Sequence, residues 1–376
     1  MRIGISQCRD TLQAVDALAT SLRAPDLRLA VVFASSHHDP DLLGPALRDS
    51  LGTATVIGCT TAGEIGPQGY GSGSIAGLAM DRQDIDFEAG LLENLSQLGA
   101  RDMVAFANDV RARLRARHPG APDQRFFAMM LIDGLCGREE IVARAFHDGL
   151  MGIPLAGGSA GDDLAFQKTH VIFNGRMVSD AAVLLVATSP RRFTTFKTQH
   201  FQATNQRLVV TGAIPEKRIV TEINGCPAAE EYARCVGLDL AGLDPYVFAA
   251  HPVVVRVGDS DFVRSIQRVN PDGNLVFFCA IDRGLAFKIA QGVDMVANLD
   301  SALARLREQI GEPEAILGFD CILRLLECRQ RNLIGPIGER LARSRVVGFS
   351  TFGEQYQGMH INQTFTGIAF GRMENT

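Results

Sequence analysis

The feature that most constrains the fold is an internal repeat without gaps. Residues 58–64, GCTTAGE, align with residues 348–354, GFSTFGE, and the likeness continues at the same spacing of 290 residues from 74–80 to 364–370. A looser third copy, GGSAGDD, covers residues 157–163. Self-similarity of this kind indicates that one supersecondary unit is used more than once. We therefore expect three related units in the chain.

The residues before each copy indicate what the unit is. The apolar run 29–36 is typical of a buried strand, residues 40–51 place leucine and alanine on one helical face, and residues 53–59 return as a strand. The same order recurs between residues 126 and 163, and in a less regular form between 314 and 354. Each copy thus predicts a strand, a helix, a strand and a small-residue turn, which is a βαβ unit.

Segments beyond the turns have the character of antiparallel strands. Asn174-Gly175 separates two apolar runs, which is a strong signal for a hairpin. Further strands are expected over 207–213, 252–258, 262–269 and 274–281, and helices over 102–117, 228–237 and 297–310. The predicted fold class is α/β, with mixed sheets built on repeated βαβ units. We expect two modules, residues 1–220 and 221–376. Because no low-complexity linker separates them, we expect the two modules to be packed together.

The composition limits the partners and the cellular location that we expect for the protein. The chain has 46% hydrophobic and 21% charged residues and a net charge of −5, which gives no electrostatic attraction to nucleic acid or to an anionic membrane. No apolar run approaches the roughly 18 residues of a spanning helix, and no basic and apolar leader is visible. Eight scattered cysteines without a CxxC pair are typical of reduced thiols. We expect a cytoplasmic protein.

The glycine-rich stretch 63–73 invites comparison with a phosphate loop. It has five glycines in eleven residues, but their spacing differs from GxGxxG and the residues that follow indicate a strand instead of a helix. The repeat favours a tight turn after a buried strand, where glycine permits positive φ or a close backbone approach. We expect Glu64, Asp162 and Glu354 to accept backbone N–H bonds in three such turns.

Several separated motifs together resemble one known family. The segments VIGCTTAGEI, GGSAGDD, EINGCPAAEEYA and GFSTFGEQYQGMHINQTFTG look like the hallmark segments of FIST (F-box and intracellular signal transduction) proteins. They occur in the family's order and the resemblance covers about residues 25–370. It implies that residues 1–220 form a FIST N-like α/β sensory module and that residues 221–376 form a FIST C-like module.

Within the family, GCTTAGEIGPQGYGSGS, FKTQHF and GEQYQGMHINQTFTGIAFG look most like the NosP branch, bacterial nitric-oxide-sensing proteins that bind haem. This resemblance implies a cytoplasmic haem b sensor of nitric oxide or another diatomic gas. It also implies a partner, either a histidine kinase of a two-component system or a diguanylate cyclase or phosphodiesterase, and an influence on biofilm behaviour. A haem sensor or haem-trafficking protein would need the same pocket and stays an alternative.

A haem b site needs an apolar pocket and an axial ligand to the iron. His200, between aromatic residues of TTFKTQHF and near the expected module junction, is our first choice because its motif matches the haem-binding branch. His170 begins the predicted hairpin, and His360 belongs to a segment that resembles the whole family, where a structural hydrogen bond to the turn is the favoured role. Cys226 is the fourth candidate, since a Cys-Pro dipeptide can present a thiolate to haem iron.

Two other classes of function stay open from the sequence. A module without haem would bind a small metabolite, similar to an amino acid, in the cleft between the modules. An enzyme would use Cys136, which follows a strand and precedes a helix. No histidine and acid pattern completes a triad, and the neighbouring Glu139 and Glu140 would raise the thiol pKa. We therefore expect no enzyme and no catalytic residue; a homodimer is an open option.

Overall fold

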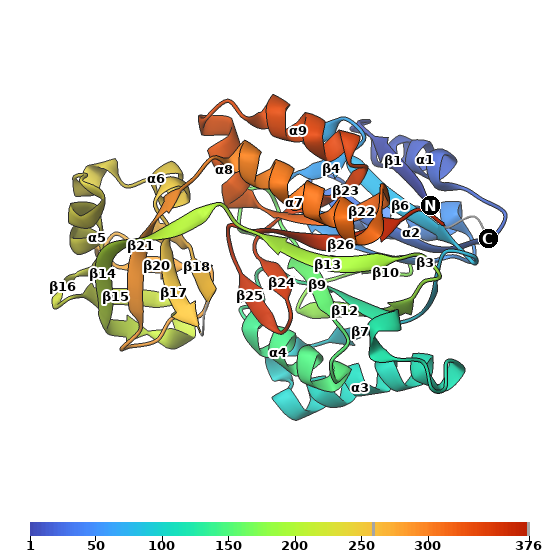
Figure 1. Ribbon diagram of the computed structural model, residues 1–376, viewed down its shortest axis with the longest axis horizontal. Helices are drawn as coiled ribbons and strands as arrows, with labels where there is room; N and C mark the ends of the chain where they lie inside the picture. The colour runs from blue at the N-terminus through green and yellow to red at the C-terminus, as the bar shows by residue number, and fades with distance from the viewer. Residues whose placement is uncertain (258–259, 374–376) are drawn as a thin grey trace.

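The computed structural model describes residues 1–257 and 260–373. Its body consists of three copies of one unit, and a smaller lobe, residues 201–292, is inserted in the third copy (Figure 1). Each unit runs strand, helix, strand, helix, strand, hairpin and strand, with two helices in place of the second helix in unit 3. The predicted α/β class with repeated βαβ units is therefore confirmed.

The first two units have the same eight elements in the same order. Unit 1 comprises β1 (Arg2–Ser6), α1 (Thr11–Leu22), β2 (Leu27–Ser35), α2 (Pro40–Leu51), β3 (Thr55–Thr61), β4 (Glu64–Gly66), β5 (Gly69–Gly71) and β6 (Ile75–Asp81). Unit 2 comprises β7 (Asp86–Glu93), α3 (Ala100–Arg117), β8 (Phe126–Ile132), α4 (Glu139–Leu150), β9 (Leu155–Ser159), β10 (Val171–Phe173), β11 (Arg176–Val178) and β12 (Ala181–Thr188).

The third unit carries the insertion between its first strand and first helix. Unit 3 comprises β13 (Phe193–Thr198), α7 (Met295–Ile310), β22 (Pro313–Cys321), α8 (Ile322–Gln330), α9 (Ile334–Arg343), β23 (Val346–Thr351), β24 (Glu354–Tyr356), β25 (Met359–Ile361) and β26 (Phe365–Gly371). The lobe comprises β14 (Phe201–Ile214), β15 (Ile219–Ile223), β16 (Cys226–Pro227), α5 (Ala228–Val236), α6 (Pro245–Ala250), β17 (Val253–Val257), β18 (Ser260–Arg264), β19 (Ile266–Val269), β20 (Leu275–Phe277) and β21 (Ala286–Gly292).

Each unit gives its hairpin to the sheet of another unit. The sheet of unit 1, ordered β1-β6-β2-β3-β10-β11, ends with the hairpin of unit 2. The sheet of unit 2, ordered β7-β12-β8-β9-β24-β25, ends with the hairpin of unit 3, and that of unit 3, ordered β13-β26-β22-β23-β4-β5, ends with the hairpin of unit 1. The exchange closes a ring, so every sheet of the body is built from two units.

Backbone hydrogen bonds join the three turns that follow β3, β9 and β23. Each bond runs from a turn amide to the carbonyl at the end of a neighbouring strand: Ala62 to Ser350 (3.0 Å), Gly161 to Thr60 (2.9 Å) and Phe352 to Ser159 (3.3 Å). The parallel strands approach closely just before these turns. A Cβ atom on Gly58 would lie 1.9 Å from the Val32 carbonyl oxygen, and one on Gly348 would lie 1.8 Å from that of Gly318. The repeated glycine is therefore a packing requirement.

The three sheets share one apolar centre, and helices cover their outer faces. In the centre Phe33 stacks on Phe349 with ring centroids 4.8 Å apart, and Phe319 meets both rings edge-on. Helices α1 and α2 cover the first sheet, α3 and α4 the second, and α7 and α9 the third. Burying each such phenyl ring stabilises the fold by about 1.5–3 kcal/mol.

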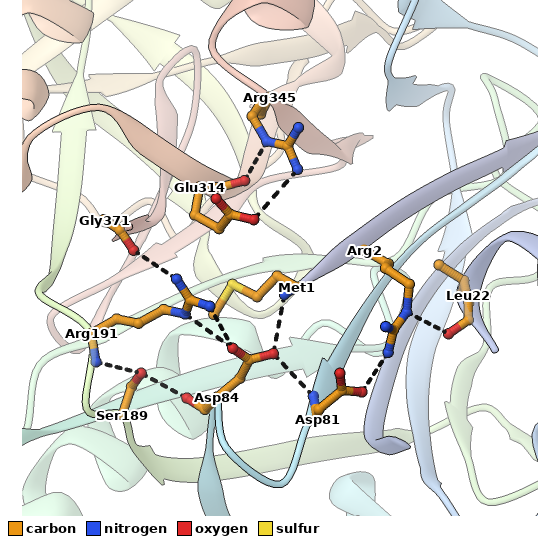
Figure 2. A network of polar contacts seen from close by, with 10 residues as sticks. All are labelled: Met1, Arg2, Leu22, Asp81, Asp84, Ser189, Arg191, Glu314, Arg345 and Gly371. Carbon is orange, nitrogen blue, oxygen red and sulfur yellow. Dashed lines mark hydrogen bonds and ion pairs between the residues drawn. The ribbon is translucent and has the colours of Figure 1, made fainter. Parts of the chain in front are cut away.

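The loops that connect the units meet in a network of polar contacts around Asp84 (Figure 2). Asp84, between β6 and β7, forms ion pairs with Arg191 of the β12–β13 loop (2.7 Å) and with the Met1 ammonium (3.1 Å). Arg191 also donates to the Gly371 carbonyl at the end of β26 (3.4 Å). Burial would raise the pKa of Asp84, but hydrogen bonds from Arg191 and the Asp81 amide outweigh it and lower that pKa. These contacts tie all three units together.

The secondary structure follows most of the expectations from the sequence. The helices expected at 102–117, 228–237 and 297–310 are α3, α5 and α7, and Asn174-Gly175 forms the β10–β11 turn with φ of 48° and 86°. The less regular segment of unit 3 contains two helices, α8 and α9. Residue 258, in the strand expected over 252–258, lies outside the described residues. The division at residue 220 stays a prediction; that residue lies in β15, inside the lobe.

The turn carboxylates accept the bonds that the repeat predicted. Glu64 accepts from the amide and hydroxyl of Ser74 (2.9 and 2.7 Å), and Glu354 accepts from those of Thr364 (3.1 and 2.6 Å). Asp162 accepts from three successive backbone amides, at residues 166–168. Burial raises the pKa of Glu64, and it raises the pKa of Glu354 to about 8. The carboxyl of Glu354 is therefore predominantly protonated at neutral pH.

We predict that Glu354→Gln reduces the free energy of unfolding less at pH 8 than at pH 5. A carboxyl whose folded-state pKa exceeds its unfolded value contributes stability that falls as pH rises through the interval from about 4.5 to about 8. Urea denaturation at the two pH values measures the difference. Glu308→Gln, on the exposed face of α7, is the control and should show no such dependence. An equal cost for Glu354→Gln at both pH values would contradict the prediction.

Candidate functional site

A cleft of about 230 Å³ lies between the body and the lobe. Its walls come from the β8–α4 loop, the segment after β9 and the turn after β23 in the body, and from the β14–β15 connection, β19 and β20 in the lobe. Its lining includes two charged residues and three phenylalanines: Glu139, Arg218, Phe166, Phe278 and Phe352. The cleft thus lies at the carboxyl ends of the parallel strands β8 and β9, the position where open α/β sheets place ligands.

The β8–α4 loop is shaped by an aspartate and two glycines. The Asp133 carboxylate accepts a hydrogen bond from the Leu135 amide (3.0 Å), which turns the chain directly after β8. A Cβ atom on Gly134 would lie 2.0 Å from the Ala160 carbonyl oxygen, so only glycine fits there. Gly137 has φ of +66° and leads the chain into α4. The first turn of α4 consequently begins at the cleft.

Three phenyl rings form one wall of the cleft. Phe166 stacks on Phe352 with centroids 4.9 Å apart and planes at 28°, and it meets Phe278 of the lobe at 6.0 Å. Phe166 has φ of 51°, a left-handed conformation that costs a bulky residue about 1–3 kcal/mol. The stacking holds this conformation in place, and the aromatic wall spans the junction between body and lobe.

The opposite part of the cleft is charged. The Arg218 guanidinium contacts the carboxylates of Glu139 (2.5 Å) and Glu140 (2.6 Å) and donates to the Phe278 carbonyl oxygen (2.7 Å). Burial raises the pKa of Glu139 to about 7, against the opposing charge of Arg218. For Glu140, burial is outweighed by the charge of Arg218 and a hydrogen bond from the Ala280 amide, so its pKa is lowered. Two carboxylates therefore share one guanidinium at the junction between body and lobe.

A buried polar cluster adjoins this site. His360, on β25, is 3% exposed, and its Nδ1 atom accepts from the Gln355 side chain (2.9 Å), which also donates to the Ser159 hydroxyl (2.9 Å). Within the described residues, His360 Nε2 has no hydrogen-bond partner by distance and angle. Burial lowers the pKa of His360 to about 4, so the ring is neutral. The ring is thus bonded to β24, the strand that follows the turn after β23, and its role stays a prediction.

The structure places His200 at the junction of body and lobe and surrounds it with hydrogen-bond partners. The ring is buried, Nε2 lies 2.8 Å from a Glu327 carboxylate oxygen, and Nδ1 lies 2.9 Å from an Arg324 nitrogen. Burial, with the charge of Arg324, lowers the pKa of His200 against the opposing effect of Glu327. Both ring nitrogens are therefore engaged.

The other two haem-ligand candidates lie elsewhere. His170 precedes β10, and its main chain bonds Thr60, with the amide donating to the hydroxyl (3.0 Å) and the carbonyl accepting from the amide (2.9 Å). Cys226 is exposed on β16, at the end of the lobe farthest from the body (Figure 1). The four candidates His200, His170, His360 and Cys226 are not brought into one site.

His200 does not fit an axial haem ligand in this arrangement. An axial histidine needs a nitrogen lone pair facing the iron, whereas both nitrogens of His200 are bonded to protein. The cleft volume of about 230 Å³ lies below the roughly 300 Å³ at which pockets for drug-sized ligands begin. Four larger cavities, of about 280 to 480 Å³, have no histidine among their described lining residues.

Two family models match this chain. The model of the FIST N domain matches residues 28–226, and that of the FIST C domain matches residues 228–357. The repeated α/β body with its inserted lobe thus belongs to the FIST family. The chain is also similar to an uncharacterised protein of Methanocaldococcus jannaschii, with 22% identity over 306 residues, 74% of this chain and 57% of that protein. This chain therefore spans little more than half the length of that relative.

Family membership makes the chain a sensor module of signal transduction. Neither family model separates the NosP branch from other members, so haem and nitric oxide stay proposals. In the described ranges, no helix has the length and apolar character needed to cross a bilayer.

Sequence reasoning missed most of the cleft, although signals for it were present. Phe352 stands where the equivalent turns have Ala62 and Gly161, so the aromatic side chain departs from the repeat. The pair of glutamates at the start of α4 was visible only as a neighbour of Cys136. Arg218 and Phe278 gave no signal, because they reach the cleft through the inserted lobe.

We predict that Arg218→Ala destabilises the protein by about 3–5 kcal/mol, because it leaves two carboxylates without their shared cation. Urea denaturation of the purified variant measures the loss. The exposed neighbour Lys217→Ala is the control and should stay within about 0.5 kcal/mol of the wild type. Adding Glu139→Gln to the Arg218 variant should recover part of the loss. If Arg218→Ala and Lys217→Ala lower the free energy of unfolding by the same amount, Arg218 does not stabilise the junction between body and lobe.

Proposed function

We propose that this FIST protein is a sensor of a small zwitterionic metabolite, of the amino-acid class with an apolar side chain, bound in the cleft between body and lobe. The observation that carries the proposal is the combination of a carboxylate, a guanidinium and three phenyl rings in a cleft of about 230 Å³. Such a space suits a small metabolite, and its lining has groups for all three parts of an amino acid.

The charges favour a ligand that carries both signs. Glu139 is the natural partner for a ligand ammonium, and the phenyl rings of the aromatic wall attract cations as well as apolar groups. A guanidinium has five N–H donors, and Arg218 uses three contacts in the structure, so donors remain for a ligand carboxylate. The apolar side chain would then lie against Phe166 and Phe352.

A binding role without catalysis is part of the proposal. The Cys136 thiol donates to the Asp133 carbonyl (3.0 Å), and burial together with Glu139 raises its pKa well above the ordinary range. Such a thiol is not a nucleophile at neutral pH. Ligand occupancy would instead be relayed to a signalling partner, a histidine kinase or a cyclic-di-GMP enzyme in a cytoplasmic setting.

Thermal denaturation with added ligands tests the proposal. L-leucine, L-methionine and L-phenylalanine are the probes, and 3-methylbutylamine and 4-methylpentanoate, which each lack one charge of leucine, are the matched controls. A ligand at 100 times its dissociation constant stabilises a protein by about 2.7 kcal/mol, so the midpoint should rise by several degrees with at least one amino acid. Neither leucine analogue should match leucine.

The variant Glu139→Gln should weaken binding of the amino acid about tenfold, while Glu216→Gln on the lobe surface should not.

The haem and nitric oxide hypothesis predicts the opposite pattern. Under it, one equivalent of haemin gives a Soret band that His200→Ala removes and that nitric oxide shifts in the ferrous state, and the amino acids have no effect. That outcome would overturn the proposal in favour of a haem sensor.

A further inference from the structure

The lobe is joined to the body by two chain segments that lie side by side. The chain enters from β13 into β14 and leaves from β21 into α7. Phe201 pairs with Gly292 in the ladder between β14 and β21, and the Val293 amide donates to the His200 carbonyl oxygen (2.7 Å). We call residues 198–201 and 292–294 the hinge. Any rotation of the lobe relative to the body has to pass through it.

The side chain of His200 attaches the hinge to one helix of the body. Its Nδ1 atom accepts from Arg324 (2.9 Å), and its Nε2–H donates to Glu327 (2.8 Å). The guanidinium has donors only, so Nδ1 must be the acceptor and the ring proton must lie on Nε2. Arg324 and Glu327 lie about one turn apart on α8. The ring is thus held against α8 at two points.

The contacts continue from α8 into the body. Arg324, 1% exposed, also donates to Asp320 (2.6 Å), which accepts from the Tyr70 hydroxyl (2.5 Å). Glu327 is paired with Arg331 (2.7 Å). Tyr70 belongs to the hairpin that unit 1 contributes to the sheet of unit 3. Buried charges of this kind are tolerated only while each keeps its partners, so the network fixes where His200 can lie.

The same helix reaches the ligand cleft. The apolar face of α8, including Ile322, Leu325 and Leu326, forms one buried cluster with Phe278 and Phe352 of the aromatic wall. Helix α6 of the lobe packs on α8 as well. A change in the position of the lobe on α8 therefore changes the distance between the two sides of the cleft.

We propose that His200 is a positioning residue, whose two bonds to α8 set the angle between lobe and body and thereby the width of the ligand cleft. The effect on the position of the lobe does not depend on the proposed function. The effect on ligand affinity rests on the proposed function. The two effects have separate readouts, so failure of one is distinguishable from failure of the other.

A distance measurement between lobe and body tests the first effect. A spin label on Cys226, exposed on the lobe, is paired with one at Leu12→Cys, an exposed position of α1, in a background of Cys8→Ser, Cys136→Ser and Cys235→Ser. The unchanged His200 background should give one narrow distance distribution by pulsed electron resonance.

Three variants in this background separate positioning from general stability. His200→Ala should broaden the distribution. His200→Gln, whose amide can still donate to Glu327, should give an intermediate width. Gln202→Ala, exposed two residues further along β14, should match the parent. A narrow, unshifted distribution in folded His200→Ala overturns the proposal.

Ligand affinity provides the second readout. With L-leucine as probe, His200→Ala should weaken binding at least tenfold and His200→Gln should weaken it less, with far-ultraviolet circular dichroism unchanged in both. If the wild type binds no amino acid but His200→Ala still broadens the distance distribution, the proposed function fails and the positioning role stands. If affinity and distance are both unchanged, the positioning role is wrong.

Hydrogen exchange on the wild-type protein keeps the proposal testable if His200→Ala does not fold. The Val293 amide, bonded to the His200 carbonyl, should exchange as slowly as the amides of α8, because the hinge and the helix form one fixed unit. Exchange of Val293 at the rate of an exposed turn would show that the hinge opens independently of α8, and it would overturn the proposal.

Discussion

The body depends on one constraint, the circular exchange of hairpins between the three units. The three bonds between turn amides and strand-end carbonyls close this ring at one end of the strands, and the Asp84 contacts with Arg191 and Met1 close it at the other. Each sheet has a helix-covered face and a face that belongs to the common apolar centre. Because no sheet is completed by its own unit, the helices and the shared centre are positioned only when all three units are present.

The inserted lobe turns this symmetric body into a protein with one distinct site. At the turn after β23, Phe352 replaces the small residues of the two equivalent turns, and the lobe brings Phe278 and Arg218 to the same place. The aromatic wall and the shared guanidinium are therefore local departures from the repeat. The ligand-sensing function that we propose depends on these departures, whereas the repeated carboxylates Glu64 and Glu354 serve the turns.

Much of the body could be predicted from the sequence because its signals are local. Hydrophobic periodicity gave α3, α5 and α7, and the Asn174-Gly175 turn specified a hairpin. The exchange of hairpins could not be predicted. The sequence pattern of a strand indicates that it joins a sheet, but it does not identify the neighbouring strand in that sheet. The surroundings of His200 could not be predicted, because the two partners on α8 that bond its ring lie more than 120 residues away in the sequence.

The ring of exchanged hairpins also has a consequence for how the chain folds. Ile65 of β4 pairs with Gly348 of β23, so the first hairpin to leave the ribosome finds its partner strand only when the chain is nearly complete. Contacts so distant in sequence make folding slow, and a strand edge that waits for its partner is a site for aggregation. The hairpin that is synthesised first is thus among the last to pair, and newly made chains pass through a stage in which the sheets of units 2 and 3 are both incomplete.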